Sequence, residues 1–249
     1  MTTVLKLGGS LITEKSSPET LDDRALAAAA DAVARATTDG AAEGELVLVH
    51  GAGSFGHHHA DRHGMSVTEG VRDAGAVMDV HGAMTTLNRF VLSRLHERGV
   101  DALPVHPLST AARDADGDLT LPLDQVRTML GEGFLPVLHG DGVAHAGEGV
   151  TVLSGDEVVV RLARGLDADR VGMCSTVPGV LDADGDVIAR VGAFADVADA
   201  LGGSDATDVT GGMAGKVRTL LSLDAPAHVF GPDALDAFLA GEDAGTRIE

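Results

Sequence analysis

A short apolar run that leads directly into a glycine-rich loop constrains this chain more than any other stretch. Residues 46–49 are all apolar and rich in β-branched side chains, which is typical of a strand buried on both faces. The run continues as His50-Gly51-Ala52-Gly53-Ser54-Phe55-Gly56-His57, and a helix is expected to start there. Glycines at such a turn let backbone N–H groups approach an anion, and a helix N-terminus adds partial positive charge. The stretch predicts a phosphate-binding turn, although a tight turn that binds nothing has the same pattern.

The glycine spacing of this loop also satisfies G-x-G-x-x-G, so a dinucleotide-binding fold must be considered. Such a fold needs a second strand that ends in an acid to hold the ribose. Residues 57–70 are instead histidine-rich and polar. A dinucleotide-dependent oxidoreductase is therefore disfavoured.

Strands and helices alternate along the rest of the chain. Strands are expected at 3–7, 46–49, 102–105, 134–138, 169–173 and 227–230, and helices at 21–36, 70–98, 124–130, 154–166, 211–223 and 232–240. Residues 113–121 predict an acidic turn or hairpin, and 142–152 a glycine-rich excursion. Alternation of this kind predicts a three-layer α/β/α fold with a mostly parallel central sheet covered on both faces. We expect a single domain over residues 1–249, with a division into two lobes near residue 150.

The charge of the chain excludes several classes of partner. Its formal net charge is −20, which argues against nucleic acid and against anionic membranes. Charged residues interrupt every apolar stretch well before the length of a membrane span, and the N-terminus lacks a signal-peptide pattern, so we expect a cytoplasmic protein. Cys174 is the single cysteine, which excludes an intrachain disulfide, and its place in a strand predicts a small core residue.

The acidic residues are mostly aspartates, and only three of the 18 basic residues are lysines. An Asp-rich, Lys-poor surface predicts a halophilic protein, because concentrated salt screens the repulsion between like charges. The remaining lysines then need an explanation. Lys6 and Lys15 flank the turn Gly8-Gly9-Ser10, and Lys216 follows Gly211-Gly212. The last is not a Walker A loop, because the glycine spacing differs and Val217 stands where Ser or Thr would hold magnesium. Phosphoryl transfer requires cations and amides around the migrating group, and three such lysines fit that demand.

Four motifs together resemble the amino acid kinase superfamily and, within it, the isopentenyl phosphate kinase family of the alternative mevalonate route. They are Lys6-Leu7-Gly8-Gly9-Ser10, His50 to His57, Ser154-Gly155-Asp156, and Val209-Thr210-Gly211-Gly212-Met213 with Lys216. The resemblance covers residues 4 to about 231, and its specific part is Gly-Ser-Phe-Gly-His with a lysine at 15. It implies ATP-dependent phosphorylation of isopentenyl phosphate to isopentenyl diphosphate, with Mg²⁺ carried in by ATP. It also implies a homodimer, an acceptor-binding lobe at 1–150 and a nucleotide-binding lobe at 151–249.

The resemblance also implies roles for individual residues. Lys6 and Lys216 would hold the ATP phosphates, Lys15 would assist at the transferring phosphoryl group, and Asp156 would orient the lysines. His57 would hydrogen-bond the phosphate of the acceptor. The remaining implied contacts are Gly8, Gly9, Ser10, Gly53, Thr176, Gly179 and Gly212 with ATP, and Ala52, Gly53 and Gly155 with the acceptor.

The chain departs from the family pattern at two places. Ala52 replaces the middle glycine of three, and its methyl group requires a negative φ. The family's Thr-Asp-Val-Asp-Gly becomes Ser175-Thr176-Val177-Pro178-Gly179, which removes two acids from the nucleotide side. Thr176 can then offer ATP only a hydroxyl or backbone contact.

An isoprenoid acceptor also needs an apolar slot for its tail. Val77, Met78, His81 and Met84 recur at helical spacing just after the histidine-rich loop, so we expect these four residues to line that slot, with Val77, Met78 and His81 in contact with the substrate. Ordinary core packing explains the pattern equally. His59 and His63 have the spacing of zinc ligands on a helix, but the nearby acid, Asp61, points elsewhere, so no metal site is expected.

Two other functions remain open. One is a kinase for another small acceptor, such as fosfomycin, a second phosphate compound, or an acyl or carbamoyl group. The other is a non-catalytic anion-binding protein of the same fold. An assay for ADP release separates the second from any kinase.

Overall fold

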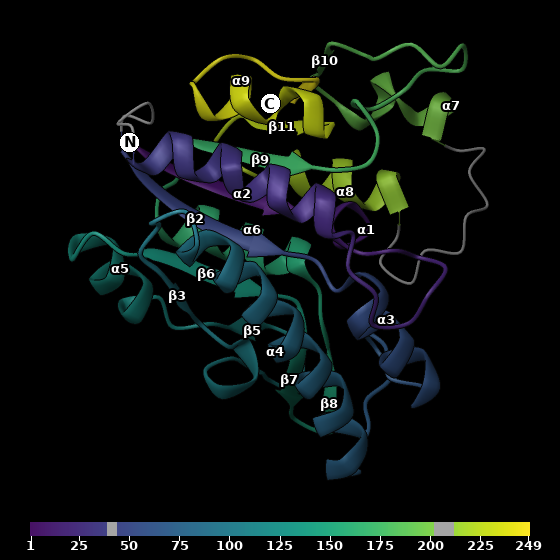
Figure 1. Ribbon diagram of the computed structural model, residues 1–249. Coiled ribbons are helices and arrows are strands. Elements are labelled where there is room, and N and C mark those ends of the chain that lie inside the picture. The colour runs from purple at the N-terminus through teal and green to yellow at the C-terminus, as the bar shows by residue number, and fades with distance from the viewer. Residues whose placement is uncertain (39–43, 202–211) are drawn as a thin grey trace.

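The computed structural model describes residues 1–38, 44–201 and 212–249, which fold around one large sheet (Figure 1). The eight strands of this sheet are, in spatial order, β10 (Arg190–Val191), β12 (Thr246–Ile248), β11 (Ala227–Phe230), β9 (Arg170–Cys174), β1 (Thr2–Leu7), β2 (Glu45–His50), β6 (Leu135–His139) and β3 (Ala102–Pro104). All neighbouring pairs are parallel except β11 and β12. The predicted three-layer α/β/α fold with a mostly parallel sheet is confirmed.

Helices cover both faces of this sheet, and the alternation of side chains along the central strands decides which face each residue meets. Leu5, Leu7 and Leu48 pack in the core under α2 (Asp23–Thr38), α4 (Ala74–His96) and α9 (Leu235–Leu239). Val4 and Val47 belong to the opposite core, which contains α5 (Asp124–Gly131), α6 (Gly155–Gly165) and α8 (Gly212–Leu220). Because successive side chains of a strand point to opposite faces, Lys6 lies on the same face as Val4, toward α6.

A smaller sheet lies beside the lower part of the molecule in Figure 1. It consists of β5 (Leu119–Thr120), β4 (Ala112–Arg113), β7 (Asp141–His145) and β8 (Gly149–Leu153). The expected hairpin at 113–121 is β4 and β5. The stretch 142–152, which the glycines suggested to be an irregular excursion, is the antiparallel hairpin of β7 and β8. Gly147 (φ 88°) and Gly149 (φ 97°) occupy positive-φ positions in and beside its turn, so the glycines shape a tight turn between strands.

The remaining elements are short. They are α1 (Gly9–Ile12), α3 (Gly53–Arg62), α7 (Ala198–Leu201), and the 3₁₀ turns η1 (Pro107–Ser109), η2 (Phe194–Asp196) and η3 (Pro232–Ala234). The helix expected at 70–98 begins at Ala74, because the Asp73 carboxylate caps it by accepting a hydrogen bond from the Ala76 N–H. Its predicted stop at Gly99 has φ 76°, a conformation that ends helices.

The expected division into lobes near residue 150 falls inside β8, and the assignment of the two lobes stays a prediction. Within the described ranges, no helix combines the length and the apolar character that crossing a membrane would require.

Candidate active site

The ends of β1, β2 and β9 and the starts of α3, α6 and α8 surround one cavity of about 260 Å³. All of these elements meet at the carboxyl edge of the parallel strands, where open α/β sheets bind ligands. Thirteen predicted site residues line it: Lys6, Gly8, Gly9, Ser10, Lys15, Ala52, Gly53, His57, Gly155, Asp156, Thr176, Gly212 and Lys216. The structure thus brings together residues that are up to 210 positions apart in the sequence.

Two glycine turns form the floor of the cavity by direct contact between their backbones. A Cβ atom on Gly9 would lie 2.1 Å from the amide nitrogen of Gly53, and a Cβ on Gly51 would lie 2.5 Å from that of Gly9. Gly53 also has φ 51°, the left-handed region that side chains disfavour. The first amides of α3, which starts at Gly53, have no partner inside the helix and are the groups that bind phosphate elsewhere. Ala52 has φ −75°, so its methyl group is accommodated without strain.

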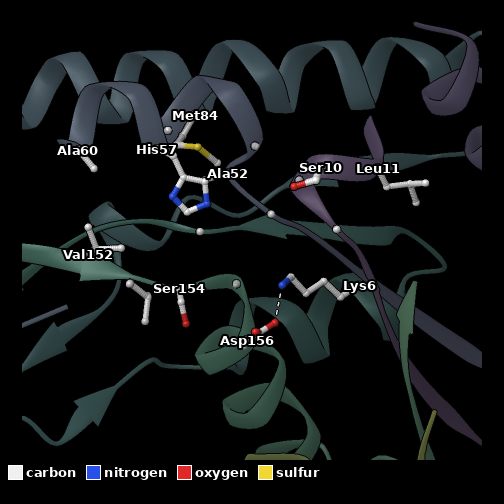
Figure 2. Close-up of a pocket in the computed structure, with 18 of the residues that line it drawn as sticks. Lys6, Ser10, Leu11, Ala52, His57, Ala60, Met84, Val152, Ser154 and Asp156 are labelled. Carbon is white, nitrogen blue, oxygen red and sulfur yellow. Dashed lines mark hydrogen bonds and ion pairs between the residues drawn. The ribbon is translucent and has the colours of Figure 1, made fainter. Parts of the chain in front are cut away.

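Three charged side chains converge on the opposite wall of the cavity. Lys6, which is only 8% exposed, forms an ion pair with Asp156 on α6. Figure 2 shows this pair across the cavity from His57. Lys216 on α8 places its Nζ 3.9 Å from the other carboxylate oxygen of Asp156. Burial alone would raise the pKa of Asp156, but the charges of Lys6 and Lys216 and the hydrogen bond from Lys6 outweigh it and hold that pKa below its usual value.

The start of α6 is built to leave room for the Lys6 side chain. Ser154 caps the helix by accepting a hydrogen bond from the Glu157 N–H, and the Glu157 carboxylate accepts one from the Ser154 N–H. A Cβ atom on Gly155 would lie 3.0 Å from the Lys6 Cε, so a larger residue would crowd the lysine. Asp156 follows as the second residue of the helix, where the helix dipole also favours its negative charge.

The side of the cavity that α3 forms combines two basic groups with apolar side chains. His57 projects from α3 into the space above the Lys6–Asp156 pair (Figure 2). Lys15, which is exposed, also lines the cavity. The lining also contains an apolar group of side chains, Ala60, Met65, Val67, Val80, Met84 and Val152, together with the carboxylates Asp61 and Asp141. The site can therefore hold an anion with a short hydrocarbon group attached.

Of the tail residues predicted on α4, Met84 lines this cavity, whereas Val77, Met78 and His81 are not among its lining residues. Met78 is 56% exposed, and Val77 is half-buried outside the lining. The helix also contributes Val80, which the sequence analysis did not identify. Helical spacing alone leaves the rotation of a helix about its axis uncertain by one residue, so the face that meets the cavity was assigned incorrectly in part. His81 lies one layer behind, with its Nδ1 3.0 Å from each carboxylate oxygen of Asp141, and Asp141 does line the cavity.

The loop after β9, where ATP contacts were predicted, lines the cavity only in part. Ser175, Thr176 and Val177 line the cavity, whereas Gly179 is not among its lining residues. A Cβ on Gly179 would meet Val187 at 2.6 Å and Thr246 at 2.7 Å, so this glycine serves close packing. Cys174 is buried as predicted, and burial raises the pKa of its thiol to about 12. The Val209-Thr210-Gly211 part of the fourth motif lies outside the described residues.

A row of histidines, not singled out in the sequence, lies behind the glycine turns. His50 and His139 end the paired strands β2 and β6 in register, and their rings stack 5.3 Å apart. His106 continues the row, with its Nδ1 2.8 Å from the Nε2 of His139. Burial lowers the pKa of His50 to about 3 and that of His139 to about 4, so both rings are neutral at pH 7. The sequence signal was the matching histidine at the end of two adjacent strands.

Comparison with known proteins points to one family. The sequence profile described as the Amino acid kinase family matches residues 1–223. A protein of Haloferax volcanii named isopentenyl phosphate kinase is 65% identical over 245 residues, which are 98% of this chain and 97% of that protein. A protein of the same name from Methanocaldococcus jannaschii is 30% identical over 262 residues, covering 100% of this chain and 99% of that one. The fold matches a structure titled "X-ray structures of isopentenyl phosphate kinase" with a TM-score of 0.85, 26% identity and complete coverage of both chains.

Proposed function

The chain belongs to the amino acid kinase family, and from this premise we propose that it transfers the γ-phosphoryl group of ATP to isopentenyl phosphate, giving isopentenyl diphosphate and ADP. The observation that carries the proposal is the pairing of two chemically different walls in one cavity. One wall holds Lys6 and Lys216 around Asp156, and the other holds His57 beside an apolar pocket. A phosphate acceptor with a five-carbon tail matches the second wall.

Lys6 and Lys216 act on the nucleotide side. Their ammonium groups offset negative charge on the γ-phosphoryl group as its bond to the ADP oxygen breaks. Asp156 keeps both lysines in place by its charge and hydrogen bond, and because its pKa is depressed it stays ionised at any neutral pH. Gly9 and Gly53 let the two glycine turns pack against each other at the floor of the cavity, where we expect backbone amides to bind the phosphates. Gly8 lines the same floor, but its own N–H donates to the Cys174 carbonyl.

The acceptor needs no strong general base. Its phosphate has a second pKa of about 6, so an oxygen is already ionised near pH 7 and forms the new bond to phosphorus directly. His57 donates a hydrogen bond to this phosphate, and Lys15 adds a positive charge at the rim where the two anions meet. These two residues lower the repulsion between acceptor and ATP that would otherwise oppose the reaction.

Mg²⁺ is expected to arrive with ATP. Asp156 and Asp141, two of the carboxylates that line the cavity, are paired with lysines and with His81, so neither is available as an uncommitted ligand. Mg²⁺ prefers octahedral coordination by oxygen, and in such sites it uses phosphate oxygens and water as ligands. When bound, it neutralises phosphate charge.

The test is an ADP-release assay of the full chain with isopentenyl, dimethylallyl and geranyl phosphates, fosfomycin and carbamate, each in low and multimolar KCl. We expect isopentenyl phosphate to give the highest kcat/KM and a diphosphate product detectable by ³¹P NMR. Faster turnover of fosfomycin or carbamate would replace this substrate assignment. Binding of ATP without ADP release for any acceptor would favour the non-catalytic alternative.

The homodimer, the cytoplasmic location and the halophilic character remain predictions. The three are consistent with the acidic composition and with a reaction that consumes ATP. Sedimentation of the purified chain at several KCl concentrations measures the first and the third together.

A further inference from the structure

Two histidines and an aspartate meet outside the active-site cavity, at the junction of α3 and α4. His59 lies on the last turn of α3, His63 follows directly after that helix, and Asp79 lies on the second turn of α4. One donor atom from each of the three lies within 4.8 Å of the others. The sequence could not show this, because Asp79 is 16 residues from His63, whereas the nearby Asp61 lines the cavity instead.

A fourth side chain orients the first of these histidines. The Glu19 carboxylate lies 2.7 Å from Nε2 of His59, and Nδ1 of the same ring is buried without a hydrogen-bond partner in the described part of the chain. If Nε2 donates its proton to Glu19, Nδ1 carries an unused lone pair. A carboxylate bonded to one imidazole nitrogen is the usual outer partner of a histidine that ligates a metal through the other.

From this arrangement we propose that His59, His63 and Asp79 bind a divalent transition-metal ion of the zinc type, with Glu19 as the carboxylate that orients His59. Two imidazoles and one carboxylate are ligands that zinc accepts, with water completing four-coordination. Zinc–ligand bonds of about 2.0–2.2 Å place neighbouring donors of a tetrahedral site about 3.3–3.6 Å apart. His63 Nε2 and Asp79 Oδ2 lie 2.8 Å apart, so they need to separate by about 0.5–0.8 Å to admit the ion.

The site would connect three segments that form the acceptor side of the cavity. α3 carries His57, α4 carries Val80 and Met84, and the segment that contains Glu19 also carries Lys15. An ion at this junction holds these segments together without touching the substrate. The proposal concerns metal binding alone and stands independently of the proposed phosphoryl transfer.

The experiment uses tag-free, chelator-treated full chain and titrates Co²⁺ as a spectroscopic probe, followed by displacement with Zn²⁺. We expect one Co²⁺ per chain with the visible absorption of a four-coordinate ion, and a rise in Tm with Zn²⁺. His63→Gln and Asp79→Asn should abolish the absorption, and Glu19→Gln should weaken binding about 10- to 100-fold, the range for an outer carboxylate. His58→Gln is the matched control, because His58 is an exposed histidine of the same helix outside the cluster.

Three results would overturn the proposal. They are no saturable Co²⁺ binding in the wild-type chain, binding that persists in both His63→Gln and Asp79→Asn, and equal loss in His58→Gln. The first leaves two ordinary histidine–carboxylate pairs, and the others indicate unspecific binding to the histidine-rich segment. Because Asp79 is exposed, its substitution is not expected to unfold the chain, and circular dichroism of each variant verifies this.

Discussion

Replacing Asp156 by asparagine tests the charged wall of the active site most directly. The substitution keeps the shape of the side chain but removes the negative charge between Lys6 and Lys216. Two opposite unit charges about 4 Å apart attract each other by about 4 kcal/mol at an effective dielectric constant of 20, and Lys216 lies 3.9 Å from the carboxylate. The side chains of Lys6 and Asp156 are only 11% and 21% exposed, so water replaces little of this attraction. Breaking a buried ion pair in this way costs about 3–5 kcal/mol of the free energy of unfolding.

This loss converts into a measurable melting temperature. For a chain of this length each kcal/mol shifts Tm by about 2–4 °C, so Asp156→Asn should lower Tm by about 6 °C or more without nucleotide. The phosphates of ATP bring negative charge to the same lysines. Saturating ATP should therefore raise the Tm of the variant more than that of the wild-type chain. The pKa of Asp156 is depressed, so its contribution is present above about pH 4 and is lost only as pH falls through the folded-state pKa.

The assay is thermal unfolding followed by circular dichroism at one fixed KCl concentration, between pH 6 and 8, with and without Mg-ATP. Asp116→Asn is the control, because it removes the same charge from an exposed position. The reasoning is refuted if Asp156→Asn melts with the control, or if ATP stabilises the variant no more than the wild-type chain.

Three further predictions use independent readouts. Lys216→Ala should lower kcat about 100-fold or more in the ADP-release assay, the scale for losing one preorganised charge, and a value within threefold of wild type would remove Lys216 from the catalytic set. Val80→Phe should abolish activity with geranyl phosphate while sparing activity with isopentenyl phosphate, since each buried methylene is worth about 0.8 kcal/mol. Met78→Phe, on the exposed side of the same helix, should leave activity with both substrates unchanged. If the two variants have the same activities, the tail does not bind beside Val80. A hydrogen bond to Asp141 raises the pKa of His81, so His81 stabilises the fold fully below about pH 6.5 and loses this effect as pH rises through its folded-state pKa. The Tm difference between wild type and His81→Gln should therefore shrink from pH 6 to pH 8.5. A Tm difference that stays constant over this range would contradict the prediction.

The parts of the fold that local pattern determines were predictable from the sequence. Apolar runs such as 46–49 and glycine turns at strand ends identify a parallel sheet and its ligand edge, because both depend on neighbouring residues. The hairpin of β7 and β8 was missed, since glycines that mark an irregular loop and glycines that form a tight turn look alike. The pairing of β12 with β11 joins residues about 20 positions apart. Both strands are short, and no local pattern in the sequence indicates which strand pairs with which.

The residues of the candidate site also fall into those that local sequence patterns predict and those that depend on tertiary packing. Lys6 and His57 were predictable because each stands beside a glycine turn, whereas Asp156 was expected only because Ser154-Gly155-Asp156 resembles a motif of the family. The rotation of α4 was not, since tertiary packing rather than spacing decides that Val80 faces the cavity while Met78 faces solvent. The cluster of His59, His63 and Asp79 could not be predicted from the sequence either, because Asp79 lies near the two histidines only when α3 packs against α4.

The contact between Gly9 and Gly53 has a consequence for recombining this chain with its relatives. The two turns touch through main-chain atoms, and the side chain of Thr13 joins them by donating a hydrogen bond to the Gly9 carbonyl and accepting one from the Ser54 N–H. A contact of this kind contains no complementary side-chain pair that could be mismatched when the segments come from different parents. Chimeras joined within α2, between the first turn and the second, should therefore assemble an intact cavity floor from any two parents that retain both glycines and Thr13. Their losses of stability should arise in the leucine and valine core instead.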